Sequence, residues 1–183
     1  MFGRFRQARR DKAIGAALYG AIVAQARAPA LYARLGVPDT VDGRFQMVVL
    51  HLALVLRRLR MDGDAGKATG QELFDLFCSD MDRSLRELGV GDLVVPKRMR
   101  KMAEAFYGRS AAYDAALDGD PGVALEEALG RNVFGDAASA GGRALASYVI
   151  ASAERLANAD AEVVLAGRLP FPDPANFAAY VPA

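Results

Sequence analysis

The sequence predicts an all-α protein, a single compact bundle of about six helices followed by an extended, proline-rich tail. Apolar residues recur with a period near 3.6 residues along most of the chain, and no stretch alternates apolar and polar residues as a half-buried strand does. Only 8% of the residues are aromatic and alanine is abundant, which favours closely packed helices. Four prolines after Leu169 disfavour regular helix there. We therefore expect one helical domain over residues 1–168 and a tail over 169–183.

Composition excludes several classes of protein. The chain has 183 residues, of which 52% are hydrophobic, so it can bury the core of one domain. Its net charge of only +1 argues against a dedicated nucleic-acid binder, and no DNA partner is expected. Because it contains one cysteine, Cys78, and one histidine, His51, it cannot build a disulfide framework, a thiolate metal cluster or a His-rich metal site. We expect no metal and no cofactor.

The first helix is expected over about 11–27, because its large apolar residues between Ile14 and Val23 share one face. The arm before it, residues 1–12, carries five cations against one anion. A charged arm before an apolar segment also resembles a cleaved signal peptide, and its net charge of +4 would attract anionic lipid. We favour a helix that packs into the core. A short helical piece at 30–35 follows.

The second helix, over about 40–60, is expected to be the centre of the domain. Thr40 is a suitable N-cap, and apolar residues cover all sides of the helix. Its most apolar stretch, 45–56, is shorter than the roughly 20 residues that span a bilayer, so no transmembrane helix is expected. The glycine-containing segment 61–69 is predicted to be a connecting loop.

The third helix is expected over about 71–88, with a buried stripe that ends at Leu88 and a stop at Gly89, which suits the C′ position. Residues 90–95 are expected to be short and extended. The fourth helix then begins at Pro96, a preferred first-turn residue, and continues to about Leu117.

The last two helices are expected over about 121–133 and 139–156. Pro121 opens the first of them behind the capping Asp120, and Ser139 precedes the second. The tail that follows is expected to be pinned to the bundle by its aromatic residues, Phe171, Phe177 and Tyr180.

Candidate catalytic and metal-binding residues do not assemble into a site. His51 is expected to be a core histidine bonded to a neighbouring carbonyl or carboxylate rather than a general base, because no nucleophile pattern accompanies it. Cys78 is expected to act as a small buried hydrophobe. The aspartates within 75–82 diverge around a helix and cannot share one ion, and Asp82 is expected to pair with Arg86 instead. The sequence therefore indicates a protein that is not an enzyme.

The start of the predicted fourth helix is unusually basic. Cations crowd its first turn and a half, where the helix dipole disfavours them, and one more continues the face: Lys97, Arg98, Arg100, Lys101 and Arg109. One interpretation is a solvated face, or pairing with Asp82 or Glu87 of the preceding helix. The other is a surface for an anionic partner, because cations placed against a dipole need a reason beyond solubility.

The segment from Glu72 to Arg109 resembles the ubiquinol-cytochrome c chaperone family. The elements DMDRSLRE, GVGDL, VPKRMRKM and AFYGR occur in the order expected for that family, and the similarity extends over roughly 31–117. Arginine far outnumbers lysine, which indicates a GC-rich genome and a bacterial member of the family.

The resemblance implies an assembly chaperone that binds cytochrome b, or another subunit of ubiquinol-cytochrome c reductase. It also implies a small helical partner protein, and a cytoplasmic location with peripheral contact at the inner membrane. The residues expected to bind a partner are Asp82, Arg86, Lys97, Arg98, Arg100, Lys101 and Arg109. The rival hypothesis is a ribosome- or RNA-binding module that uses the same bases together with Arg57, Arg58 and Arg60.

Overall fold

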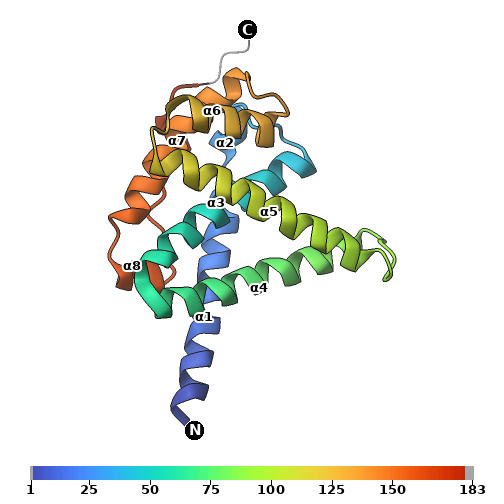
Figure 1. Ribbon diagram of the computed structural model, residues 1–183, viewed down its shortest axis with the longest axis vertical. Coiled ribbons are helices and arrows are strands. Elements are labelled where there is room, and N and C mark those ends of the chain that lie inside the picture. Colours follow the sequence, from blue (N-terminus) through green and yellow to red (C-terminus); the bar gives the residue numbers. More distant parts are fainter. Residues whose placement is uncertain (1, 180–183) are drawn as a thin grey trace.

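The computed structural model describes the backbone of residues 2–179 and the side chains of residues 9–179. It contains no strand between residues 2 and 179, so the all-α prediction is confirmed (Figure 1). Within this range, six α-helices have eight or more residues and two have five. In chain order the elements are α1 (Phe2–Ala26), α2 (Pro29–Ala33), α3 (Val41–Leu59), η1 (Arg60–Asp62), α4 (Gly63–Glu87), α5 (Val95–Asp118), α6 (Gly122–Leu129), η2 (Gly130–Phe134), α7 (Ala140–Ala157), α8 (Ala161–Leu165) and η3 (Pro174–Asn176).

Helix α3 is the centre of the bundle, as its apolar surface predicts. Thr40 caps it by accepting a hydrogen bond from the Gly43 amide at 3.0 Å. Helices α1, α4, α5 and α7 all pack against α3. Helix α1 contributes Leu18 and Ile22 to the core, both without exposed surface, so the expected packing of the first helix is confirmed.

The loop predicted over 61–69 is wrong. The chain leaves α3 through the short 3₁₀ turn η1, and α4 begins at Gly63, which has a φ of +64°. Gly66 belongs to α4 and lies so close to α3 that a Cβ there would stand 2.0 Å from the Leu59 carbonyl oxygen. Glycines that resemble a flexible loop in the sequence therefore serve a tight reversal and a close helix crossing.

The extended segment expected over 90–95 is wrong, because residues 91–94 form a turn and Val95 is the first residue of α5. Gly89 has a φ of +78°, and the Val90 amide bonds the Leu85 carbonyl at 3.0 Å, which closes the end of α4 as predicted for a C′ glycine. The Val94 amide then bonds the Gly91 carbonyl at 2.8 Å. This compact turn lets α5 fold back along α4 directly.

The helix expected over 121–133 divides into α6 and the π turn η2. The π turn begins at Gly130. The backbone packs closely there, since a Cβ on Gly130 would lie 2.4 Å from the Asp136 carbonyl oxygen. The tail after Leu169 lacks α-helix within the described residues and contains only η3. Its Phe171 and Phe177 rings contact His51 and Tyr148, which confirms two of the predicted anchors. Tyr180 lies outside the described residues.

Candidate functional site

Helices α4 and α5 form a hairpin that projects from the body of the molecule. They converge at their outer ends and diverge toward α3 (Figure 1). We call residues 88–94, where the chain turns from α4 into α5, the hairpin tip. The predicted partner-binding residues lie on this hairpin, at positions that the two helices fix.

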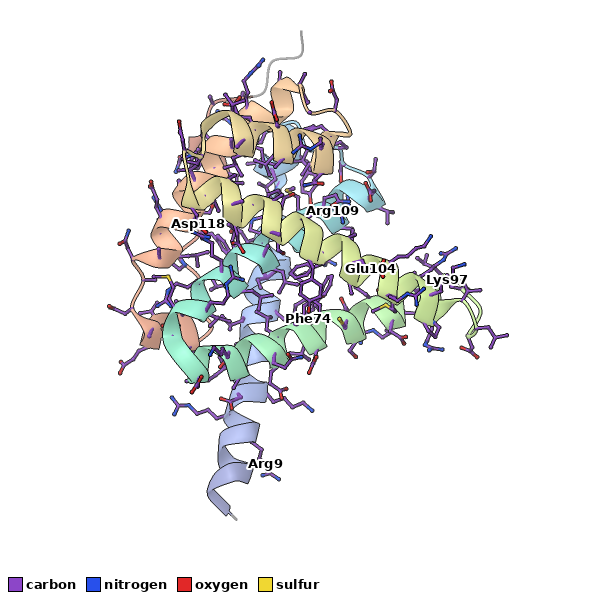
Figure 2. All side chains as sticks on the ribbon, viewed as in Figure 1. Arg9, Phe74, Lys97, Glu104, Arg109 and Asp118 are labelled. Atoms are coloured by element: carbon purple, nitrogen blue, oxygen red, sulfur yellow. The ribbon has the colours of Figure 1, made fainter. Side chains whose placement is uncertain are left out.

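Four of the predicted bases gather next to the hairpin tip. Lys97, Arg98, Arg100 and Lys101 are exposed in the first two turns of α5, and Figure 2 places Lys97 near its outer end. Arg109 does not join them, because eleven residues of helix put it about 16 Å from Arg98 along the axis. It is half-buried, and its Nε has no hydrogen-bond partner among the described residues.

Carboxylates of α4 do not neutralise these bases. Asp82 pairs with Arg86 at 2.6 Å, as predicted, and Arg86 also pairs with Asp92 of the hairpin tip. Glu87 approaches Arg83 at 3.9 Å. The expected alternative, in which Asp82 or Glu87 pairs with the bases of α5, is therefore wrong.

Carboxylates of α5 itself neutralise little of the charge of the basic cluster Lys97, Arg98, Arg100 and Lys101. Within the described part of the chain, Lys97, Arg98 and Lys101 form no ion pair, and Arg100 approaches only Glu104, at 3.8 Å. The side chains of Arg100 and Glu104 are both largely exposed, so this pair contributes little stability. The cluster presents uncompensated positive charge to solvent.

An aromatic groove opens where α4 and α5 diverge. It has a volume of about 300 Å³, and Phe74, Phe106 and Tyr107 line it beside Leu56 and Leu59. The Phe74 ring lies 5.1 Å from Phe106 and 5.6 Å from Tyr107, measured between ring centroids, and Figure 2 shows Phe74 between the two helices. Tyr107 is 61% exposed, so its ring is available to a partner.

The ubiquinol-cytochrome c chaperone family model matches residues 33–171, which include the whole hairpin and the aromatic groove. The chain belongs to this family. Because it is a family of assembly chaperones for ubiquinol-cytochrome c reductase and not of enzymes, the prediction that the chain is not an enzyme is confirmed.

Curated members of the family match part of the chain. Ubiquinol-cytochrome-c reductase complex assembly factor 1 of Xenopus laevis is 27% identical over 103 residues, which cover 56% of this chain and 51% of that protein. The human protein is 30% identical over 104 residues and is covered to 34%. The chain thus aligns with between a third and a half of the length of these relatives.

A solved family structure matches almost the whole chain. The Cbp3 homolog from Brucella abortus superposes with a TM-score of 0.85 at 40% sequence identity, covering 97% of this chain and 99% of that one. The fold described above is therefore the fold of this chaperone family.

Two features of this chaperone's hairpin were missed by sequence reasoning. Leu88, expected to end a buried stripe, is 75% exposed, because the last turn of α4 extends beyond the body. Leu93 and Val94 are also exposed. The second feature is Tyr107, which lines the groove, whereas the sequence indicated only that it belongs to the AFYGR element. The signal available for the hairpin tip was the apolar run Leu93 to Val95 between a glycine turn and the basic cluster.

The core histidine behaves as expected. His51 is fully buried, with Nδ1 2.7 Å from the Met47 carbonyl oxygen and Nε2 2.6 Å from the Tyr148 hydroxyl. Since the carbonyl can only accept, Nδ1 carries the proton and Nε2 accepts from Tyr148. Burial lowers the pKa of His51 to about 4, against the opposing effect of the bond to Met47. The imidazole is therefore neutral at physiological pH.

Cys78 and the acidic residues add no chemistry. Cys78 is half-buried rather than fully buried, and burial raises the pKa of its thiol, which keeps it protonated. Between residues 9 and 179, no group of His, Cys, Asp and Glu side chains could hold a metal ion.

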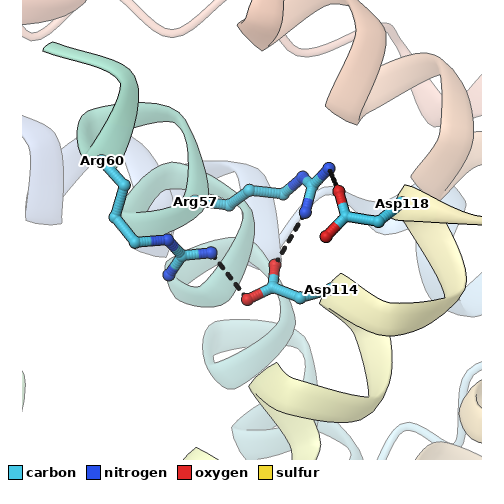
Figure 3. Close-up of polar contacts among 4 residues, drawn as sticks. All are labelled: Arg57, Arg60, Asp114 and Asp118. Atoms are coloured by element: carbon cyan, nitrogen blue, oxygen red, sulfur yellow. Dashed lines mark hydrogen bonds and ion pairs between the residues drawn. The ribbon is translucent and has the colours of Figure 1, made fainter.

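Three arginines of the RNA-binding hypothesis, Arg57, Arg58 and Arg60, are paired within the fold, and Figure 3 shows the pairs of Arg57 and Arg60. Arg57 bonds Asp114 at 3.2 Å and also Asp118, while Arg60 bonds Asp114 at 2.6 Å. Arg58 is buried and pairs with its neighbour Asp62 at 2.6 Å. These three cations tie α3 and η1 to each other and to α5, which leaves them less available to phosphate groups.

Among the residues that the structure describes, one segment, Arg9–Ala33, is long and apolar enough by length and composition to cross a membrane. Leu18, Ile22 and Ala26 on its apolar face are buried in the bundle as in a core helix, while 28% of the most apolar window of the segment is buried.

Proposed function

We propose that this chaperone binds cytochrome b and holds an apolar segment of it while ubiquinol-cytochrome c reductase is assembled. The observation that carries the proposal is the aromatic groove between α4 and α5, which lies in the part of the chain that the family model covers. Tyr107 is exposed there, beside the half-buried ring of Phe74 and the buried ring of Phe106. Large exposed aromatic residues beside a hydrophobic hollow are typical of binding sites for apolar chain segments.

The groove is suited to a membrane protein that has not yet reached its partners. Its walls are apolar, and Lys67, Gln71 and Arg60 stand at its rim. A transmembrane segment of cytochrome b would cover the apolar walls, and its loop termini would meet the polar rim. We further propose that the chain is bacterial and acts in the cytoplasm at the inner membrane surface, with a small helical partner protein as a further contact.

Affinity capture of the full-length chain from detergent-solubilised native membranes tests this function. The wild-type chain is expected to capture cytochrome b without enrichment of ribosomal RNA. Tyr107→Ser is expected to lower capture about tenfold or more, because a bound segment no longer buries the aromatic ring. Val123→Ser, which also replaces an exposed apolar residue but on α6, serves as the matched control and should capture normally.

Two results would refute the proposal. One is that the Tyr107→Ser and Val123→Ser variants capture the same amount of cytochrome b, because the groove would then have no part in binding it. The other is enrichment of ribosomal RNA in place of cytochrome b, with binding that weakens steeply as salt rises, which is the behaviour of a nucleic-acid partner.

A further inference from the structure

The hairpin tip gathers exposed apolar side chains. Of the seven large hydrophobic residues that the described chain exposes, three fall within residues 88–94: Leu88 at 75%, Leu93 at 97% and Val94 at 45%. Single exposed apolar residues are normal on soluble proteins, but a cluster at the end of a projecting hairpin marks a contact surface.

Three of the uncompensated bases share a helix face with Val94 of this apolar cluster. Val94 has helical backbone angles and directly precedes α5, so positions 94, 97, 98 and 101 follow the spacing of one helix face. That face begins with the apolar Val94 and continues with Lys97, Arg98 and Lys101. Residues 86–101 contain five cations and two anions, although the whole chain has a net charge of only +1.

We infer that the hairpin tip docks on the surface of an anionic lipid bilayer, with Leu88, Leu93 and Val94 inserted and the bases of α5 on the lipid phosphates. Seven residues of helix separate Val94 from Lys101 by about 10 Å along the axis. The headgroup layer of one leaflet is about 5 to 8 Å thick, and amphipathic elements bury their apolar face about 5 to 10 Å into it. Apolar residues at the acyl boundary therefore leave the bases at the depth of the phosphates.

An acidic protein would pair with the bases but would leave the apolar side chains of the hairpin tip exposed to water. Leu93 is almost entirely exposed at the end of the hairpin, where it stands ahead of the charged face rather than within it. This order, apolar residues leading and cations following, matches the layering of a bilayer from acyl chains to phosphates. The inference rests on the proposed location at the inner membrane surface, but this surface lies outside the aromatic groove, so its failure would leave the proposed binding of cytochrome b standing.

Vesicle flotation of the full-length chain tests the inference. The probes are vesicles of phosphatidylcholine alone and vesicles that also contain phosphatidylglycerol, at low salt. The wild-type chain is expected to float only with the anionic vesicles. Leu93→Ser should weaken that binding roughly tenfold through lost apolar burial. Arg98→Gln/Lys101→Gln should weaken it roughly 30-fold, since each base near an anionic surface contributes about a fivefold factor.

Matched controls separate the hairpin tip from general charge and hydrophobicity. Val41→Ser removes an exposed apolar residue elsewhere, and Arg143→Gln/Arg168→Gln removes two exposed cations that have no ion pair in the described chain. Both are expected to bind as the wild type does. The Leu93→Ser variant should still capture cytochrome b from detergent extract, and Tyr107→Ser should still float with anionic vesicles.

Three results would overturn the inference. The wild-type chain failing to float with anionic vesicles is one. Equal binding by the wild type, Leu93→Ser and Arg98→Gln/Lys101→Gln is another, because it would assign membrane binding to a different part of the chain. The third is salt-sensitive capture of an acidic protein through the same bases without any vesicle binding. Circular dichroism of each variant confirms that a loss does not come from unfolding.

Discussion

Replacing His51 removes a buried group whose titration makes folding dependent on pH. The pKa of His51 in the folded chain is lowered by burial to about 4, from an ordinary value of 6.5. As pH falls, the unfolded chain therefore takes up the proton before the folded chain does. The stability of the folded chain that depends on neutral His51 is therefore fully present above about pH 6.5 and is lost progressively as pH falls toward 4.

The magnitude follows from these two values. Between about pH 8 and about pH 5, this difference in pKa removes roughly 2 kcal/mol from the free energy of unfolding, and the loss approaches about 3 kcal/mol below pH 4. Tyr148, whose hydroxyl contacts Nε2 of His51, does not change the direction of this pH dependence. Burial raises the pKa of Tyr148 to about 12, so the phenol stays protonated between pH 8 and pH 4.

Urea denaturation of the wild type and of His51→Leu at both pH values is the assay. Leucine at position 51 deprives the Tyr148 hydroxyl of its acceptor, so we expect a loss of about 1 kcal/mol at pH 8. Because leucine does not titrate, the further loss at pH 5 should be about 2 kcal/mol smaller than in the wild type. Carboxylates titrate similarly in both chains and cancel in this comparison.

His51→Gln provides the control, since glutamine keeps hydrogen-bonding capacity but does not titrate in this range. It should show the same weakened pH dependence as His51→Leu with a different loss at pH 8. An unchanged pH dependence in both variants would refute the reasoning and place a water or a charge beside the imidazole. A folded His51→Leu chain that no longer supports assembly of the complex would refute the structural role instead.

The other predictions concern the hairpin, the helix crossing and the biology. Arg98→Gln/Lys101→Gln should leave the melting temperature unchanged or raise stability by up to about 1 kcal/mol, because both cations oppose the dipole of α5 and neither forms an ion pair in the described chain; a fall in melting temperature would contradict this. Gly66→Ala should lower the free energy of unfolding in urea by about 1 to 3 kcal/mol, since its Cβ would meet the Leu59 carbonyl, and an unchanged midpoint would argue against the close crossing. Removing residues 1–8 should preserve vesicle flotation that Leu93→Ser still weakens, whereas complete loss would assign binding to the N-terminal arm. A strain without the protein should contain less assembled ubiquinol-cytochrome c reductase, measured in native gels, with normal turnover per remaining complex; normal levels would count against the chaperone role.

Local features of the chain determined most of the helices. The 3.6-residue period and the capping residues Thr40, Gly89 and Pro96 predicted α3, α4 and α5 to within a few residues at most of their ends. These signals act between neighbours in the chain, so they can be read without knowing the fold. The family elements and the basic start of α5 were equally visible, which is why the sequence alone placed the candidate surface on this hairpin.

Only the tertiary structure decided which charges are free and which apolar residues are covered. Arg57 and Arg60 resemble solvent-exposed bases in the sequence, but their carboxylate partners are 54 to 61 residues away on α5. Leu88 continues a buried stripe, but α4 outruns the body that would cover it. Pairing and burial depend on residues that are distant in the chain and brought together only by packing, so local periodicity carries no information about them.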